Sequence, residues 1–221
     1  MQLQSTSRRL PIYLLIDVSG SMSGAPIDAV NAGLRDFETA LKSDPHALES
    51  AYVSILTFES SSQQIVPLSE AGCFSAPSLQ TGGGTSLGSA LRLLGECLDR
   101  DIQEKGPQHP GDWKPMVFLM TDGEPTDKWR PELAALKGRH QRRPTNLMAI
   151  GCGPQANVAV LKEISEMVLL MPDLSPEKFR TLFQWISQSV KVASKAASQQ
   201  AVGSTGGAQL PPAPPGFQIA L

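Results

Sequence analysis

The chain has 221 residues, and its 19 Lys and Arg against 21 Asp and Glu give a formal net charge of −2. This length suits one well-buried domain with short arms. The near balance of charge, without a long basic stripe, argues against a nucleic-acid partner. Three widely spaced cysteines, Cys73, Cys97 and Cys152, support neither a zinc site nor a disulfide framework.

Membrane and secretory segments are not expected. No run of the sequence approaches about 18 apolar residues, and the N-terminus lacks an apolar core of signal-peptide length. We therefore expect a soluble, cytoplasmic protein without a membrane partner.

The first half of the chain alternates strand-like and helix-like segments. The continuous apolar run 12–16 is typical of a strand covered on both faces. Residues 52–58 form the next expected strand, and 63–68 a short edge strand, because Pro67 cannot donate to a ladder. Between the strands 12–16 and 52–58 we expect a helix with one apolar stripe, formed by Ile27, Val30, Leu34, Phe37 and Leu41.

The second half continues the alternation. We expect strands at 116–121, 145–151 and 167–171, and a short helix from Trp129 that ends at Gly138. Two further helices are expected from apolar stripes, which consist of Leu87, Leu91, Leu94, Leu98 and Ile102 and of Phe179, Leu182, Phe183, Ile186 and Val190. Strand and helix in turn predict an α/β fold: a doubly wound, mostly parallel sheet with helices on both faces and one short antiparallel edge strand.

Domain boundaries follow from this pattern. We expect an N-terminal arm over 1–9, the domain over 10–193, and a flexible Pro-rich tail over 194–221. The tail begins with a linker-like composition and ends in "LPPAPPGFQIAL". Two alternatives remain for it: a disordered tail, or a docking strand that joins the sheet edge of a partner or of a neighbouring copy.

Three polar loops should meet at one edge of the sheet. The loops 17–24, 81–88 and 121–127 each follow a strand or precede a helix, and ligands of such sheets gather beyond the carboxyl ends of the strands. Their oxygen-bearing side chains are Asp17, Ser19, Ser21, Thr85 and Asp122. Carboxylate and hydroxyl oxygens suit a hard divalent cation, so we expect a Mg²⁺ site, with Mn²⁺ and Ca²⁺ as alternatives.

Simpler interpretations exist for each part of this set. Asp122 and Gly123 are a common turn pair, and Ser19 and Ser21 alone would suit a Ser/Gly loop. Only the combination on three loops favours a metal site. The nearby carboxylates of Glu59, Glu124 and Asp127 are expected to be solvated rather than coordinating.

A catalytic interpretation is the alternative. Phosphatases with an aspartate nucleophile carry a second Asp two residues later as a general acid, and that position is Ser19 here. The sequence has neither a nucleophile elbow nor a phosphate-binding P-loop. We therefore expect a non-enzymatic protein, and a metal-dependent hydrolase or phosphatase is the alternative function.

The same residues resemble a known family. Asp17-x-Ser19-x-Ser21, Thr85 after three glycines and Asp122 in Thr-Asp-Gly match the metal-ion-dependent adhesion site of von Willebrand factor type A domains, over roughly residues 10–190. The resemblance implies that these five residues hold the ion, with an acidic side chain of a protein partner completing its coordination.

A closer likeness is to TerY-type proteins of bacterial tellurium resistance. The segments "RRLPIYLLIDVSGSMSG" and "GDWKPMVFLMTDGEPTD" and the Pro-rich end carry it. It implies a scaffold or regulator in a chemical-stress response, with a protein kinase and a serine/threonine phosphatase as partners.

Overall fold

The computed structural model describes residues 8–107, 110–142, 144–199 and 210–220. Within these ranges the strands form one sheet in the order β3-β2-β1-β4-β5-β6-β7. The strands are β1 (Leu10–Asp17), β2 (Ala51–Phe58), β3 (Ser62–Glu70), β4 (Met116–Thr121), β5 (Asn146–Cys152), β6 (Met167–Met171) and β7 (Gln218–Ala220). The five strands from β2 to β6 in this order pair in parallel, whereas β3 and β7 pair antiparallel at the two edges.

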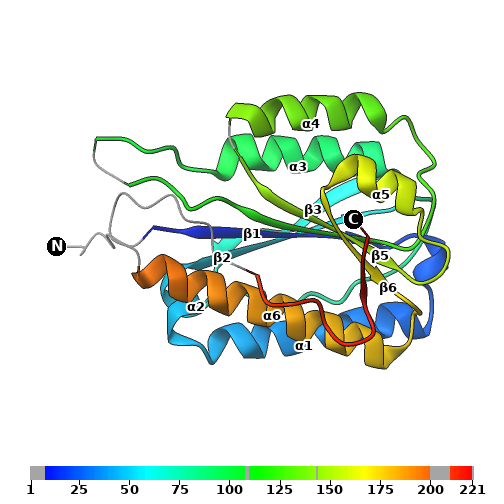
Figure 1. Cartoon of the computed structure of the whole chain (residues 1–221), viewed down its shortest axis with the longest axis horizontal. Coiled ribbons are helices and arrows are strands. Elements are labelled where there is room, and N and C mark those ends of the chain that lie inside the picture. Colours follow the sequence, from blue (N-terminus) through cyan, green and yellow to red (C-terminus); the bar gives the residue numbers. More distant parts are fainter. Residues whose placement is uncertain (1–7, 108–109, 143, 200–209, 221) are drawn as a thin grey trace.

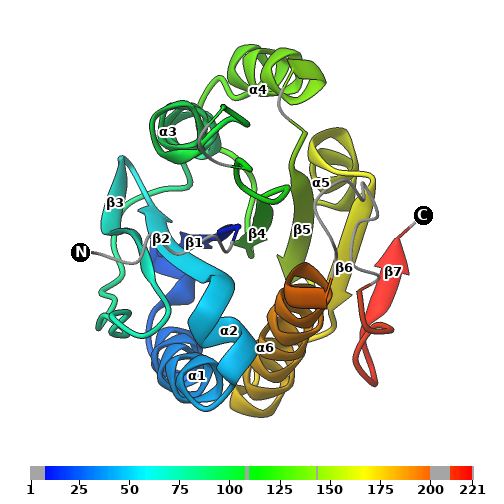
Figure 2. The ribbon, with the colours of Figure 1, turned by 90° about the vertical axis from the view of Figure 1, so that its left-hand side faces the viewer.

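Helices cover both faces of the sheet. They are α1 (Ala25–Lys42), α2 (Pro45–Ser50), α3 (Leu87–Asp101), α4 (Arg130–Arg142), α5 (Val158–Ile164) and α6 (Pro176–Gln199). Figures 1 and 2 show α1, α2 and α6 on one face and α3, α4 and α5 on the other. This arrangement confirms the doubly wound α/β fold predicted from the sequence, but the described residues have two antiparallel edge strands, β3 and β7, where one was expected.

The central strand β1 shows why its sequence is continuously apolar. Ile12 and Leu14 pack into the core beneath α1 and α6, while Tyr13 and Leu15 pack beneath α3 and α4. Because both faces are covered, every residue of β1 is buried. The apolar stripe predicted for α1 is also buried throughout.

The helix predicted over 129–138 is longer than expected. α4 continues through Gly138 to Arg142, and α2 was not predicted at all. A glycine inside a helix costs only about 1 kcal/mol, and Arg139 beyond it pairs with Asp99 across 2.5 Å. Pro45 at the first turn and the Asp44 side chain, which accepts from the Ala47 amide, define α2.

The predicted N-terminal arm is anchored at its last two residues. Arg9 donates two hydrogen bonds to the Asp112 carboxylate, at 2.8 and 2.6 Å. The Arg8 guanidinium lies 3.8 Å from the ring centroid of Trp113, at the amino end of β4. Residues 1–7 lie outside the described residues.

The C-terminal region also differs from a flexible tail over 194–221. α6 continues to Gln199, and residues 210–220 pack on the domain and end in β7, which pairs with β6 of the same chain. The segment thus docks as a strand, but on a sheet edge of its own chain and not on that of a partner or of a neighbouring copy, as the second alternative has it. Residues 200–209 lie outside the described residues.

None of the helices in the described part of the chain combines the length and the apolar character that a bilayer span requires.

Candidate metal centre

The predicted site lies where the sheet changes direction. β1 pairs with β2 on one side and with β4 on the other, so the chain winds outward in both directions from the β1–β4 pair. Asp17 is the last residue of β1, and Asp122 directly follows β4. Both carboxylates therefore emerge at the carboxyl edge of the sheet, at its topological switch point, as expected.

Hydrogen bonds order the first loop around Asp17. The Ser19 amide donates to Asp17 Oδ1 at 2.9 Å, and the loop then forms a 3₁₀ turn over Gly20–Met22. The hydroxyls of Ser19 and Ser21 are 3.1 Å apart. The turn thus brings both hydroxyls to the side of the loop that carries the carboxylate.

The third loop joins the first through two side-chain hydrogen bonds. Ser21 Oγ donates to Asp122 Oδ1 at 2.9 Å, and Thr121 Oγ1 donates to Asp17 Oδ2 at 2.6 Å. Sequence reasoning missed Thr121, although its position next to Asp122 on a predicted strand was a signal. Two of the three loops thus share one hydrogen-bonded cluster of oxygen atoms.

Thr85 reaches the same region from the second loop. Its amide donates to Thr126 Oγ1 at 3.2 Å, and the Thr126 amide donates to the Thr85 carbonyl at 2.9 Å. The Thr85 side-chain oxygen lies 3.5 Å from the place that a Cβ on Gly123 would occupy, and so beside Asp122. Thr126 was also missed, since a lone threonine in a polar loop carries no pattern.

The glycine run before Thr85 has a structural reason. Gly83 adopts a φ of 61°, and a Cβ there would overlap Glu59 and Ser60 in the β2–β3 turn. The Gly83 carbonyl accepts from the Gly20 amide at 3.2 Å, which ties the second loop to the first. Glycine is required at this position by backbone conformation and by close approach.

The other carboxylates near the loops have protein partners. Asp127 accepts from the amides of Gly88 and Ser89 at 2.9 and 3.0 Å and so caps α3 from a distant loop, which corrects the expectation that it is simply solvated. Glu124 accepts from the Asn157 side chain at 2.5 Å. Glu59 accepts from the Ser61 hydroxyl at 3.0 Å.

Burial makes the two central carboxylates electrostatically unusual. Asp17 is 1% exposed and Asp122 is 3% exposed. Loss of solvation raises the pKa of both groups; hydrogen bonds from Ser19 and Thr121 offset part of this for Asp17, and the Asp122 charge adds to it. Among the described residues no Lys, Arg or His forms an ion pair with either carboxylate.

This arrangement fits a bound divalent cation. Two buried carboxylates without a cationic side chain are costly, and a metal ion supplies the missing positive charge. Carboxylate and hydroxyl oxygens are ligands of Mg²⁺-type ions. The described part of the chain has no cluster of three or more His, Cys, Asp or Glu that could hold a metal, and the oxygen atoms beside Asp17 and Asp122 are those of hydroxyls.

A thiol adjoins the site but is poorly suited to nucleophilic chemistry. Cys152, the last residue of β5, is 1% exposed. Burial, together with the charges of Asp122 and Asp17, raises the pKa of its thiol well above the ordinary value. It therefore stays protonated and packs as a small apolar side chain, as predicted.

Comparisons with known proteins bear on the family and the fold of the chain. A sequence model of the von Willebrand factor type A domain matches residues 12–175. No curated relative matches the chain by sequence.

Solved structures share the fold at low sequence identity. They include proximal thread matrix protein 1 of the mussel byssus with a zinc-occupied MIDAS motif (TM-score 0.57, 19% identity, covering 82% of this chain and 48% of that one). A von Willebrand factor type A protein of Catenulispora acidiphila has a TM-score of 0.61 at 19% identity, and the match covers 84% of this chain and 43% of that one. The pilus adhesin SpaC of Lactobacillus rhamnosus GG has a TM-score of 0.64 at 17% identity, and the match covers 83% of this chain and 30% of that one. This chain thus spans less than half the length of each.

Proposed function

The chain belongs to the von Willebrand factor type A family, a metal-dependent protein–protein interaction fold, and on that premise we propose that it binds an acidic side chain of a protein partner through a divalent ion. The residues proposed to hold the ion are Asp17, Ser19, Ser21, Thr85 and Asp122. The observation that carries the proposal is the pair of buried carboxylates, 1% and 3% exposed, that has no cationic partner among the described residues.

The charge of the donor set supports a role in binding. Asp17 and Asp122 together neutralise a divalent charge, and the hydroxyls of Ser19, Ser21 and Thr85 add none. A bound ion would supply a Lewis-acidic position that accepts one more anionic oxygen. An Asp or Glu of a partner provides such an oxygen, and water provides a neutral substitute in the free protein.

The donor types favour Mg²⁺ as the resident ion. All five side chains offer oxygen and none offers nitrogen or sulfur, which suits Mg²⁺, with Mn²⁺ and Ca²⁺ as alternatives. The mussel matrix protein holds zinc at its MIDAS motif, so the ion must be determined by titration. Competition between Mg²⁺, Mn²⁺, Ca²⁺ and Zn²⁺ in calorimetry gives the order of affinities.

We assign the protein a binding role rather than an enzymatic one. The two histidines described, His46 in α2 and His140, which hydrogen-bonds Thr145 just before β5, lie beside the amino ends of strands. They are thus at the opposite edge from Asp17 and Asp122. The buried thiol of Cys152 stays protonated, so it supplies no thiolate nucleophile beside the site.

The finer role follows the TerY-like segments. We propose a cytoplasmic scaffold or regulator in a bacterial tellurite or chemical-stress response, with a protein kinase and a serine/threonine phosphatase as partners. The support is the resemblance of the segments around Asp17 and Asp122 and of the Pro-rich end.

Partner capture tests this function. Immobilised wild-type protein, Asp17→Ala and Asp122→Ala are incubated with the candidate kinase and phosphatase, in Mg²⁺ or in EDTA. Glu124→Gln is the matched control, because it removes a carboxylate from the same loop and keeps an acceptor for Asn157. Capture by wild type and control in Mg²⁺ only is expected; capture that persists in both alanine variants and in EDTA would refute the metal bridge.

A further inference from the structure

The C-terminal segment 210–220 lies along the domain in the manner of a bound peptide. It runs beside α6 and then turns to pair with β6, as Figure 2 shows. Leu210 and Ala213 pack against the core on the α6 side of the sheet, and Pro214 is buried. Among the described residues of the segment, Gln218, Ile219 and Ala220 pair with β6 as a strand.

Trp185 of α6 and the edge of β6 form the surface that holds the segment, and we call this surface the groove. One edge of its ring packs against Phe118 of β4, with centroids 6.3 Å apart. Its indole N–H donates to the carbonyls of Pro211 and Pro212, at 3.3 and 2.9 Å. An aromatic N–H that binds carbonyls of a proline run is a known mode of recognising proline-rich peptides.

A tight turn then positions Phe217, the aromatic side chain of the segment. The Phe217 amide donates to the Pro214 carbonyl at 3.1 Å, and Gly216 has a φ of 80°. Pro215 followed by glycine suits a type II turn. The turn places Phe217 in the core, where it is 9% exposed.

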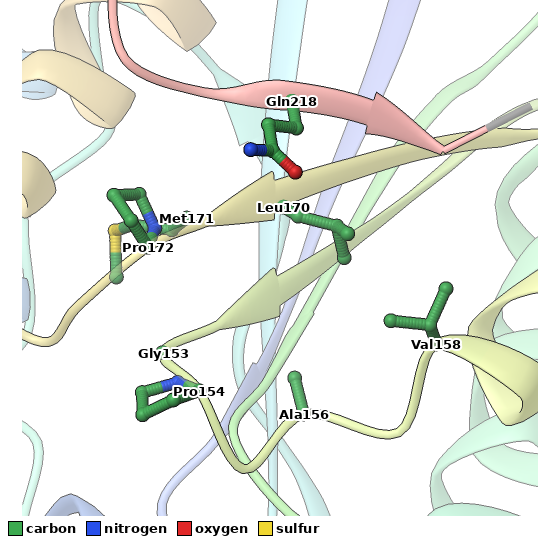
Figure 3. Close-up of a pocket in the computed structure, with 8 residues that line it drawn as sticks. All are labelled: Gly153, Pro154, Ala156, Val158, Leu170, Met171, Pro172 and Gln218. Atoms are coloured by element: carbon green, nitrogen blue, oxygen red, sulfur yellow. The ribbon is translucent and has the colours of Figure 1, made fainter.

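The strand beyond the turn is held weakly. β7 pairs through Gln218, Ile219 and Ala220 only, and Ile219 remains 56% exposed. Figure 3 shows Gln218 of β7 on one side of a depression and, on the other side, Ala156 of the loop before α5 and Val158, the first residue of α5. Release of β7 would uncover both the β6 edge and this depression.

We propose that the groove between α6 and β6 is a peptide-binding site for the C-terminal segment, filled within the chain by residues 210–220 and able to take the same segment of a second copy. Residues 200–209, with the Gly-, Ser- and Ala-rich composition of linkers, connect the segment to α6. Because the segment and the groove belong to one chain, their binding is intramolecular and prevails until it is outcompeted. We choose a second copy of this chain as the partner because its residues 210–220 have the same sequence as the segment bound in the groove.

Two full-length variants with complementary defects test the exchange. Phe217→Ala weakens the segment and leaves the groove intact, whereas Trp185→Phe keeps the aromatic ring and removes the N–H donor from the groove. Each variant alone is expected to remain monomeric in sedimentation analysis. The mixture should form a heterodimer in which the intact segment of one copy fills the intact groove of the other.

A synthetic peptide of residues 210–221 measures the affinity directly. Its labelled form should bind the Phe217→Ala chain at least about tenfold more tightly than it binds wild type, because the weakened segment competes less. A peptide that carries the same Phe217→Ala change should bind about tenfold more weakly, and one with Gln218→Ala should bind as the parent does. If Phe217→Ala does not fold, wild type with excess peptide replaces it.

The outcomes are decisive for the groove and separate from the metal proposal. Heterodimer formation and saturable peptide binding support the exchange. A mixture that sediments as monomers, together with no peptide binding to a folded chain, would show that residues 210–220 are a permanent part of the domain. EDTA should leave peptide binding unchanged, so failure here does not bear on the metal bridge.

Discussion

The Ser21 hydroxyl donates a hydrogen bond of 2.9 Å to Asp122 Oδ1, between residues 101 positions apart in the chain. The bond joins the loop after β1 to the loop after β4 at the carboxyl edge of the sheet. With Thr121 bound to Asp17 from the opposite direction, at 2.6 Å, it places two buried carboxylates in one polar cluster. The metal proposal depends on this cluster.

Removal of one carboxylate should abolish stabilisation by Mg²⁺. Asp122→Asn leaves a single carboxylate among the proposed ligands, whereas Glu124→Gln keeps both. At 100 times its dissociation constant a ligand stabilises the native state by about 2.7 kcal/mol, so wild type and Glu124→Gln should melt at higher temperature with Mg²⁺ than with EDTA. Asp122→Asn should have the same melting temperature with Mg²⁺ and with EDTA. If Mg²⁺ raises its melting temperature as much as that of wild type, the assignment is contradicted.

Thr121 is expected to act as a positioning residue for Asp17. Its hydroxyl donates to Asp17 Oδ2 at 2.6 Å, and hydrogen-bond partners of metal ligands typically contribute about 10–100-fold to metal affinity. Thr121→Val should weaken Mg²⁺ binding by this factor in calorimetry, and Thr121→Ser should restore it. If Thr121→Val and Thr121→Ser bind Mg²⁺ with equal affinity, the Thr121 hydroxyl does not position Asp17 for metal binding.

Stability without metal should depend on pH through Asp17. Burial raises the pKa of its carboxyl above the ordinary value of 3.8, so the native state holds the proton more tightly than the unfolded chain. The resulting stabilisation is fully present below pH 3.8 and is lost as pH rises through the native pKa. In EDTA, the free energy of unfolding of wild type should therefore fall relative to that of Asp17→Asn as pH rises from 3.8 through the native pKa. At higher pH the difference between the two proteins should stay constant.

Urea unfolding at a series of pH values measures this difference. The comparison with Asp17→Asn cancels the contributions of carboxylates whose pKa is lowered, such as Glu38 with its Lys42 partner. A free-energy difference between the two proteins that does not change with pH would contradict a buried, desolvated carboxylate at position 17.

Asp127 should stabilise α3 although it lies outside that helix. Its carboxylate accepts from the amides of Gly88 and Ser89 and so satisfies two free donors of the first turn. Asp127→Ala should lower the free energy of unfolding by about 1 kcal/mol, the usual value of an N-terminal cap. Asp127→Asn keeps an acceptor and should lose less; identical stability of all three proteins would mean that the contact contributes nothing.

Arg9 should contribute more to the free energy of unfolding than a surface arginine does. The Asp112 side chain is 1% exposed and receives both Arg9 hydrogen bonds, so removal of the guanidinium leaves a buried charge unpaired. Arg9→Met should cost about 3 kcal/mol in urea unfolding. Arg130→Met, which breaks the exposed pair with Glu163, is the control and should cost under about 1 kcal/mol.

The sequence predicts most of the fold because its signals are local. The continuous apolar run of β1 and the stripe of Ile27, Val30 and Leu34 each require burial on a specific face, and the structure buries them. The end of α4 could not be predicted in this way. Gly138 resembles a helix stop, but contacts made by Arg139 after it continue the helix, and those contacts join distant segments.

The candidate site was also predictable only in part. The five proposed ligands follow from residue types in loops that follow a strand or precede a helix, and the structure brings these loops together. Thr121, Thr126 and Asp127 were not predicted as partners, because their roles depend on which backbone amide or carboxylate lies opposite. The C-terminal segment was predicted to be a flexible tail because Ala, Ser and Gly precede it; Trp185, from α6, supplies the contact that holds it.

A crystal structure of the full chain grown with Mn²⁺, with anomalous diffraction recorded at the manganese edge, tests the central claim most directly. Manganese is chosen because it accepts the same oxygen ligands as Mg²⁺ and is visible by its own signal. One anomalous peak should lie among Asp17, Ser19, Ser21, Thr85 and Asp122, and it should be absent from Asp122→Asn crystals. No peak there, or a peak elsewhere only, would contradict the account.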